Sequence, residues 1–333
     1  MTVATQPVLN VSNLTVSVKV PGGGRAVVVD DMSFELAAGG RLGLVGESGS
    51  GKTMTSLAIL GMLPAAARVE AGSILFNGED LLTKKQKEMQ RIRGSQIAMV
   101  LQDPMTALDP SFTIGSQLSD PLNQHRDLSG QALEQAIVTS LEQVHLSGAK
   151  ERVNQYPHQL SGGMRQRVTS AIALAGQPKL LIADEPTTAL DSTTQARYLL
   201  LLRELQQTTG FALILVAHDL MVVRHTCDRV MVMYSSQVVE EGPVAEVFSD
   251  PRHTYTKALI DAIPTLGDEI SLESIEGQAP DITEDVAGCR FAARCRYVRE
   301  LCRTVPPDLT SRASGRAARC FGTEPGGWIG TWQ

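Results

Sequence analysis

Residues 41–53 read Arg41-Leu-Gly-Leu-Val45-Gly46-Glu47-Ser48-Gly49-Ser50-Gly51-Lys52-Thr53. A short apolar strand, Arg41–Val45, runs directly into the pattern G-x-x-x-x-G-K-[ST], and a helix is expected from Thr53 to Leu63, stopping before Pro64. A strand, a glycine-rich turn and a helix N-terminus in this order are typical of α/β folds with a parallel sheet. We therefore predict an α/β protein.

The same turn predicts a phosphate site. Its glycines let backbone N–H groups curl around an anion, and the helix that follows directs its positive dipole end at that anion. The Lys52 ammonium can reach the β- and γ-phosphates, and the Thr53 hydroxyl can ligate Mg²⁺. The alternative is an ordinary glycine-rich turn. The residues expected to bind nucleotide here are Gly46, Glu47, Ser48, Gly49, Ser50, Gly51, Lys52 and Thr53.

A second apolar run ends in two acidic residues, Asp184 and Glu185. Burying carboxylates directly after an apolar strand costs free energy unless they bind a ligand or take part in chemistry at the strand end. Asp184 is suited to hold Mg²⁺, and Glu185 is suited to accept a proton from an attacking water. An acidic pair without a role is the alternative. Beside the phosphate turn, the pair predicts a P-loop nucleotide hydrolase that uses Mg²⁺, without indicating which kind; ATP as its nucleotide is implied by the resemblance described next.

Residues 160–167, Leu160-Ser-Gly-Gly-Met-Arg-Gln-Arg167, resemble the signature of the ABC ATPases. In that family two subunits face head to tail, and each ATP lies between one phosphate loop and the opposite signature. The resemblance implies that Ser161, Gly162, Gly163 and Gln166 contact the nucleotide of a partner subunit. The alternative is a plain helix start with Ser161 as its cap.

Further positions resemble the same family. Gln102 is similar to the glutamine that senses Mg²⁺ and the γ-phosphate, and His218 to the histidine that contacts the γ-phosphate. Residues 189–191, Ala-Leu-Asp, resemble the loop that signals between the two sites. The resemblance thus implies Glu185, His218, Gln102 and Lys52 as catalytic residues and Thr53, Gln102 and Asp184 as Mg²⁺ ligands. Val18 stands where the family often stacks an aromatic residue on adenine.

The composition bounds the class of protein. The chain has 333 residues, 43% of them hydrophobic, and a formal net charge of -6, which argues against disorder and against a general nucleic-acid binder. No run reaches the roughly 18 apolar residues that span a bilayer, and the N-terminus lacks a signal pattern. We expect a chain kept in the cytosol, bound to the cytoplasmic face of the cell membrane through partners.

The resemblance also implies the domain organisation. Residues 1–250 would form the ATP-binding domain, a RecA-like mixed or parallel sheet with an antiparallel β subdomain, and a helical subdomain would occupy about 103–164. We expect the basic run at 84–93 to be a solvated linker into the helical subdomain, and we expect a C-terminal extension at 251–333. The other elements expected are strands at Val8–Val20, Val27–Leu36, Leu180–Ala183, Ala212–Val216 and Val230–Met233, and helices at Gln131–Val144 and Gln195–Gln207.

Four of the five cysteines lie in the extension, with the spacing C-x5-C-x6-C-x17-C from Cys289 through Cys295 and Cys302 to Cys320. Disulfides are not expected in the cytosol, and the short C-x2-4-C element of most structural zinc sites is missing. Four thiolates also suit an iron–sulfur cluster. The fifth, Cys227, is expected to be a small buried hydrophobe.

This extension, from Gly288 to Cys320, resembles that of oligopeptide/dipeptide importer ATPases, as does His253–Leu259. Some members hold a 4Fe–4S cluster on four such cysteines, and the resemblance implies the same for this chain, with zinc or free thiols as alternatives. Eight arginines between 290 and 319 would offset the charge of the cluster, or would form a solvated basic surface near lipid or, as a third possibility, a nucleic-acid patch.

The resemblance implies an ATPase subunit of an importer for di- or oligopeptides or related solutes, in which ATP closes a dimer and moves the permease. Implied partners are a second ATPase subunit, by family habit a different chain, two permease subunits and an extracytoplasmic substrate-binding protein. The rivals are ABC proteins acting on DNA or ribosomes, or in iron–sulfur assembly. The 58 residues from Gln102 to Leu160 leave no room for a long coiled coil, and one chain carries one ATPase half.

Overall fold

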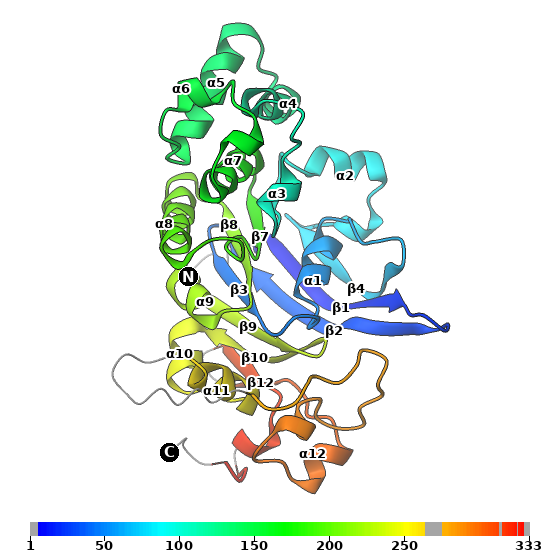
Figure 1. Ribbon diagram of the computed structural model, residues 1–333. Helices are drawn as coiled ribbons and strands as arrows, with labels where there is room; N and C mark the ends of the chain where they lie inside the picture. Colours follow the sequence, from blue (N-terminus) through cyan, green and yellow to red (C-terminus); the bar gives the residue numbers. More distant parts are fainter. Residues whose placement is uncertain (1–5, 264–274, 313–314, 325, 330–333) are drawn as a thin grey trace, which may run out of the picture. The chain divides into compact units, whose positions relative to one another are not determined.

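The computed structural model describes residues 6–263, 275–312, 315–324 and 326–329 (Figure 1). The chain divides into two compact units, which are described separately. Unit 1 comprises Met1–Asn10, Glu35–Arg41 and Leu75–Val216, and unit 2 comprises Val11–Phe34, Leu42–Ile74 and Ala217–Gln333. Both units are built from segments that are distant in sequence.

Unit 1 contains three parallel strands. β7 (Leu180–Asp184) pairs with β6 (Ile97–Val100) on one side and with β8 (Ala212–Ala217) on the other. Every residue of β7 and β8 is buried, as expected for strands covered on both faces. α8 (Ser192–Thr209) makes the crossover between them. The predicted parallel strands and their connecting helix are confirmed.

Four helices of unit 1, α4, α5, α6 and α7, lie together (Figure 1). Their apolar faces pack together through residues such as Leu118, Leu141 and Val168, each fully buried. Helices occupy much of residues 103–164, as expected, while a separate subdomain there stays a prediction. The expected solvated linker at 84–93 is wrong in part, because it contains α2, which buries Met89. The bounds are α2 (Gln86–Ile92), α3 (Pro104–Ala107), α4 (Ile114–Arg126), α5 (Gly130–Gln143), α6 (Ala149–Arg152) and α7 (Gly162–Leu174).

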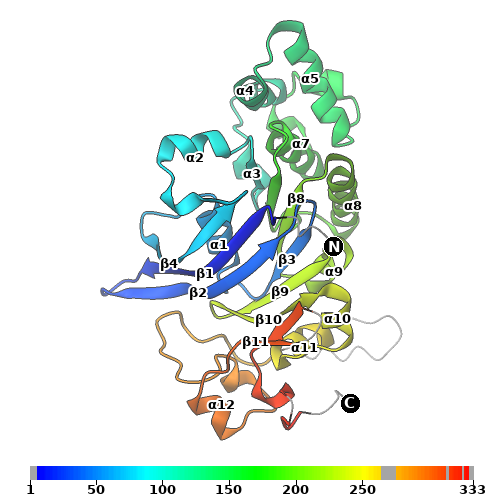
Figure 2. The same cartoon turned by 180° about the vertical axis from the view of Figure 1, so that it is seen from behind.

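Unit 2 carries a mixed sheet. β3 (Arg41–Val45) pairs in parallel with β9 (Arg229–Tyr234), and β10 (Gln237–Pro243) follows antiparallel to β9. β12 (Arg316–Ala318) pairs with β10, and β11 (Thr310–Arg312) pairs with β12 (Figure 2). The C-terminal extension therefore adds two strands to this sheet, a feature that its weak periodicity did not predict.

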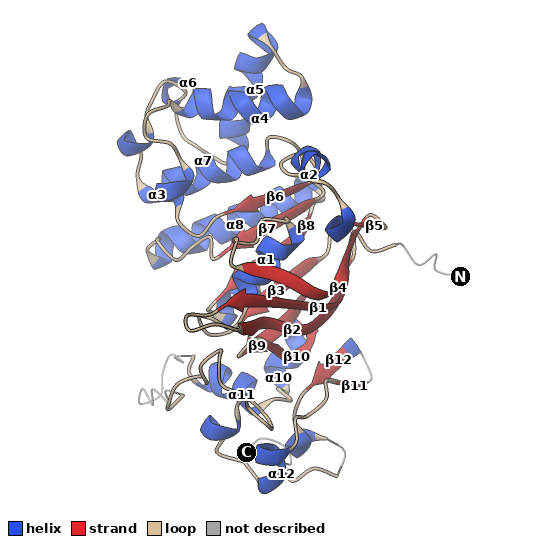
Figure 3. Cartoon of the chain, turned by 90° about the vertical axis from the view of Figure 1, so that its right-hand side faces the viewer, coloured by secondary structure: helices blue, strands red, loops and turns tan. Residues whose placement is uncertain are grey.

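A second sheet contains the N-terminal strands in the order β2-β1-β4 (Figure 3). They are β1 (Leu9–Lys19), β2 (Arg25–Leu36) and β4 (Ala67–Phe76); the short β5 (Glu79–Asp80) pairs antiparallel with the end of β4. The two predicted N-terminal strands are confirmed. The remaining helices are α1 (Lys52–Ile59), α9 (Leu220–Thr226), α10 (Val244–Ser249), α11 (Thr254–Asp261) and α12 (Glu300–Thr304). In the described part of the chain, no helix has the length and apolar character to cross a membrane.

Candidate functional site

The phosphate loop, residues 46–53, lies in unit 2 between β3 and α1. Gly49 and Gly51 adopt φ of 80° and 104°, a left-handed region that favours glycine. A Cβ on Gly51 would stand 2.2 Å from the carbonyl oxygen of Val28, and one on Gly46 would stand 2.1 Å from that of Met233. The glycines are therefore required by close backbone packing as well as by the turn. α1 ends at Ile59, four residues before the predicted end.

The side chains of the loop form a polar cradle that suits an anion. The buried Lys52 ammonium donates hydrogen bonds of 2.8 and 2.9 Å to the carbonyl oxygens of Gly46 and Glu47. The hydroxyl of Ser50 is buried and meets no hydrogen-bond partner among the described residues. Such a buried polar atom is costly unless a ligand satisfies it. Thr53 is exposed at the first turn of α1, where its hydroxyl is open to a bound cation.

Two residues of the C-terminal extension hold Glu47 of this loop. Its backbone N–H donates a 3.0 Å hydrogen bond to the Tyr255 hydroxyl, and its carboxylate forms a 2.9 Å ion pair with Arg294. More than 200 positions separate these residues along the chain. No short motif signals such a pairing, so it cannot be predicted from residue spacing.

Unit 2 also carries His218, exposed just after β8. Asp219 follows it and caps α9 by accepting a 2.7 Å hydrogen bond from the backbone N–H of Met221, so the backbone beside His218 is fixed. Val18 is half-buried on β1.

Glu185 lies at the end of β7 in unit 1. Its backbone has φ of 43°, a left-handed conformation that is unusual for a residue other than glycine and costs about 1–3 kcal/mol. The backbone N–H bonds to the carbonyl oxygen of Val216 at 2.9 Å. The carboxylate accepts hydrogen bonds from the Gln102 amide at 2.9 Å and the Thr188 hydroxyl at 3.1 Å. Strain maintained by several bonds is typical of functional sites. Thr188 was not predicted.

Asp184 directly precedes Glu185, is the last residue of β7 and is almost fully buried. Gln102 is exposed after β6, the strand next to β7. Carboxylate and amide oxygens are ligands that Mg²⁺ accepts, so the strand ends of unit 1 offer a chemically suitable set.

The signature residues form the start of α7 in unit 1. Ser161 caps the helix by accepting a hydrogen bond from the Met164 N–H, and it is exposed, as is Gly162. Gly163 packs against α8, where an added Cβ would stand 2.6 Å from the Thr194 side chain. Gln166 is fully buried, unlike the exposed Ser161 and Gly162, and its role at a partner's nucleotide stays a prediction.

The loop at 189–191 leads into α8. Asp191 is the N-cap of this helix and accepts a 3.0 Å hydrogen bond from the Thr194 N–H. This backbone hydrogen bond lowers the pKa of Asp191, which keeps the carboxylate ionised. Thr194 thus links the signature and this loop within unit 1.

All four C-terminal cysteines line one small cavity of unit 2, together with His253 and Trp328. All are free thiols. Burial raises the pKa of Cys289 to about 12, so this thiol is neutral without a bound cation. Burial lowers the pKa of His253 to about 3, and its neutral Nδ1 accepts the Tyr255 N–H. The described residues include no group of three or more His, Cys, Asp or Glu side chains that suits a single metal ion.

The arginines of the extension pair with carboxylates of unit 2. Arg290 pairs with Asp30, and Arg316 pairs with the fully buried Glu240 at 3.4 Å. Together with Arg294, they connect the extension to the rest of the unit. This pairing accounts for part of the basic character that the sequence analysis considered a cluster counter-charge or a surface patch.

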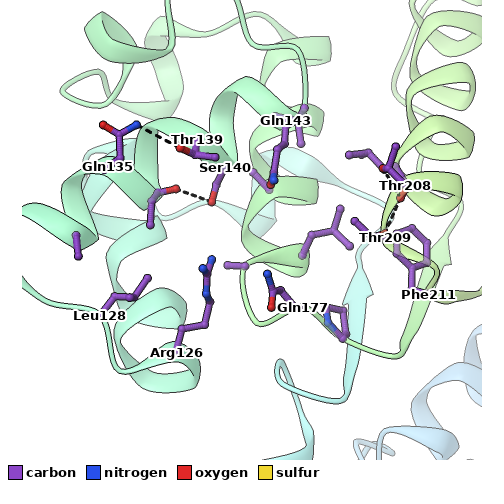
Figure 4. A pocket seen from close by; sticks show the side chains of 18 residues that line it. Arg126, Leu128, Gln135, Thr139, Ser140, Gln143, Gln177, Thr208, Thr209 and Phe211 are labelled. Atoms are coloured by element: carbon purple, nitrogen blue, oxygen red, sulfur yellow. Dashed lines mark hydrogen bonds between the residues drawn. The ribbon is translucent and has the colours of Figure 1, made fainter.

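A cavity of about 740 Å³ lies in unit 1 among α5, α7 and α8 (Figure 4). Its walls include Leu128, Gln143 and Phe211, with Arg126 as its one charged side chain. It contains no carboxylate, histidine or cysteine and none of the predicted site residues. We therefore assign no chemistry to it.

The phosphate loop, the strained glutamate after β7 and the capped signature helix define the class of an ABC ATPase, and comparison with known proteins agrees. Residues 29–188 match the family described as ABC transporter, and residues 239–302 match the oligopeptide/dipeptide transporter C-terminal region. The dimeric ATP-binding cassette MJ0796, bound to ADP and Pi, is a similar solved structure. It has a TM-score of 0.64 and 26% identity over 71% of this chain and 98% of that one.

Relatives match along nearly the whole chain. The oligopeptide transport ATP-binding protein OppD of Escherichia coli is 43% identical over 314 residues, 94% of this chain and 92% of that protein. The dipeptide transport ATP-binding protein DppD of Bacillus subtilis is 44% identical over 318 residues, 95% of each. The chain belongs to the ABC transporter family, in its branch of oligopeptide/dipeptide transport ATP-binding proteins. The fold class and the ATPase activity expected from the sequence are thereby confirmed.

Proposed function

We propose that this chain hydrolyses ATP to power an importer for di- or oligopeptides or related small solutes. The observation that carries the proposal is the Glu185 carboxylate, held at the end of β7 by Gln102 and Thr188 in a strained backbone. The identity to peptide transport proteins over about 95% of the chain supports the choice of solute.

The phosphate loop binds the β- and γ-phosphates through its backbone N–H groups and Lys52, which would turn from its own loop carbonyls to the nucleotide. The orphaned Ser50 hydroxyl and the exposed Thr53 fit this ligand. Thr53, Asp184 and Gln102 would hold Mg²⁺, which neutralises phosphate charge when bound. His218 and Lys52 stabilise the transferred phosphoryl group.

Glu185 acts as the general base in this proposal. A water oxygen attacks the γ-phosphorus, the bond to the bridging oxygen breaks, and the Glu185 carboxylate takes the water proton as ADP leaves. Gln102 orients the carboxylate through its 2.9 Å hydrogen bond. Hydrolysis then resets the closed dimer.

The exposed N-terminus of α7, with Ser161 and Gly162, would serve the nucleotide of a second ATPase subunit. Two permease subunits and an extracytoplasmic substrate-binding protein complete the proposed assembly, at the cytoplasmic face of the membrane. The division into domains at residues 250 and 251 stays a prediction.

We further propose a 4Fe–4S cluster on Cys289, Cys295, Cys302 and Cys320. These cysteines line one cavity without forming a group that suits a single metal ion. A tetrahedral zinc site would bring its sulfurs within about 4 Å of one another, since Zn–S bonds are about 2.3 Å. A cluster keeps its four thiolates further apart, so the two sites differ in the spacing of their sulfurs; the support for the cluster is that all four cysteines line one cavity.

The test is uptake by the complete assembly in proteoliposomes, with ATP inside and labelled di- and tripeptides outside. ATP-dependent uptake that is lost with Glu185→Gln would support the proposal. Hydrolysis without uptake of any peptide would contradict the peptide assignment, and the same vesicles would then be loaded with other small solutes.

A further inference from the structure

The C-terminal extension reaches the phosphate loop at Glu47. The Glu47 N–H bonds to the Tyr255 hydroxyl, the Glu47 carboxylate pairs with Arg294, and the Glu47 carbonyl oxygen accepts the Lys52 ammonium. The residue is therefore fixed at its amide, its side chain and its carbonyl. A loop whose neighbour is fixed at three points is pre-organised for its ligand.

Arg294 is itself firmly held. Its side chain is only 6% exposed, and it also bonds to the Tyr234 hydroxyl at 3.2 Å and to the carbonyl oxygen of Glu276 at 2.9 Å. The guanidinium lies 5.8 Å from the centre of the Phe291 ring, within cation–π range. Its position against Glu47 is thus set by the surrounding extension.

Tyr255 belongs to the same cluster of aromatic rings. Its ring centre lies 4.7 Å from that of Tyr234 and 5.4 Å from that of Phe291, and the side chain is fully buried. Burial raises the pKa of Tyr255, so its hydroxyl stays protonated and can accept the Glu47 N–H.

Both contacts are next to Cys295. Arg294 directly precedes it in the chain, and the hydroxyl of Thr254, the neighbour of Tyr255, lies 3.3 Å from the Cys295 sulfur. A change at the four-cysteine cavity therefore has a short covalent and hydrogen-bonded route to both residues that hold Glu47.

We propose that the C-terminal extension sets the affinity of the phosphate loop for ATP, with Tyr255 and Arg294 as positioning residues that act through Glu47. The inference rests on the proposed function only in taking ATP as the ligand of this loop. Because neither Tyr255 nor Arg294 is among the residues proposed to act on the transferred phosphoryl group, we expect the effect on ATP binding and not on the chemical step.

The experiment measures the Kd for Mg-ATP by calorimetry and the kcat and KM for hydrolysis on the full chain. Tyr255→Phe, Arg294→Gln and Glu47→Gln are each expected to raise Kd and KM by about tenfold with kcat nearly unchanged, the pattern of lost uniform binding. Arg290→Gln is the matched control, because it breaks an ion pair of the same segment with Asp30 that does not involve Glu47. It should leave Kd unchanged.

The double variant Glu47→Gln with Arg294→Gln separates positioning from general support of the fold. If the two act through each other, the double variant binds ATP no more weakly than either single variant. The proposal would be overturned if the fold-increases in Kd of the two single variants multiplied in the double variant. It would also be overturned if both Tyr255→Phe and Arg294→Gln left the Kd unchanged. If Arg294→Gln fails to fold, the proposal is still tested by Tyr255→Phe and by Glu47→Gln, since Glu47 is half-exposed.

Cys295→Ser tests the connection to the cavity. We expect a weaker Kd for ATP that Arg294→Gln does not weaken further, whereas Cys227→Ser, at the end of α9, leaves the Kd unchanged. If the double variant Cys295→Ser with Arg294→Gln multiplied the two fold-increases in Kd, Cys295 and Arg294 would act independently on ATP binding. Wild-type protein that binds ATP but drives no uptake would refute the proposed transport function while leaving this inference intact.

Discussion

The side-chain amide of Gln102 donates a 2.9 Å hydrogen bond to the carboxylate of Glu185, 83 positions further along the chain. The two residues follow neighbouring parallel strands, β6 and β7, which explains why they meet. The proposed general base and the residue proposed to sense the nucleotide are thus in direct contact within unit 1.

Glu185→Gln should abolish turnover while leaving ATP binding intact. Removing a general base lowers kcat by about 10²–10⁴-fold, and the phosphate loop is untouched. Phosphate release and the Kd for ATP are the measurements. Glu204→Gln on the surface of α8 is the control and should behave as wild type. Wild-type phosphate release by Glu185→Gln would show that another group is the base.

Gln102→Ala should lower kcat by about tenfold, less than Glu185→Gln, because the carboxylate remains but loses one of its two orienting hydrogen bonds. Thr188→Val removes the other bond and should have a smaller effect, since the 3.1 Å contact is longer. Single-turnover hydrolysis measures both. A larger loss of rate for Thr188→Val than for Gln102→Ala would mean that Thr188, and not Gln102, is the main residue that orients the Glu185 carboxylate.

Gly51→Ala should destabilise the protein and weaken ATP binding. Its Cβ would meet the Val28 carbonyl oxygen at 2.2 Å, and such overpacking costs about 1–3 kcal/mol beyond the strain of a positive φ. Gly24→Ala is the matched control, because Gly24 has φ of 85° with nothing within 4 Å. Thermal unfolding should show the larger loss for Gly51→Ala; equal losses would mean that the backbone relaxes.

Local patterns predicted much of this fold. The strands β3, β7 and β8 are buried apolar runs, and the turn after β3 has a spacing that only a phosphate loop explains well. By contrast, β11 and β12 form in a tail rich in arginine, where the partner strand β10 and the Arg316–Glu240 pair supply the stabilisation. Such tertiary pairing leaves no periodic signal.

In the site, as in the fold, residues within short motifs could be predicted and residues that act through tertiary contacts could not. Lys52, Glu185 and Ser161 stand in motifs, and the structure places them at a loop, a strand end and a helix cap. Gln166 shares its motif but is buried, since a helix turns each residue by about 100° and its face points inward. Tyr255 and Thr188 were missed because they matter through contacts, which spacing does not reveal.

Ser161→Ala should damage hydrolysis more than it damages stability. The lost cap costs about 1 kcal/mol. Thr113→Ala is the matched control, because Thr113 caps α4 by accepting the Ser116 N–H but lies outside the signature. Both variants should melt slightly earlier, whereas only Ser161→Ala should lower the ATPase rate of assembled complexes with the second subunit. If Ser161→Ala and Thr113→Ala lowered the ATPase rate equally, Ser161 would act only as a helix cap.

Anaerobic purification decides the chemistry of the four cysteines. The chain should contain about four irons with acid-labile sulfide and absorb visible light, and Cys295→Ser should lose all three signals, whereas Cys227→Ser should keep them. The thiol of Cys289, whose pKa burial raises to about 12, must lose its proton to bind iron, so loading should release protons and become weaker at low pH. One zinc without sulfide would contradict the cluster and assign a single ion to the four cysteines. Protein without any metal would contradict the proposed cluster.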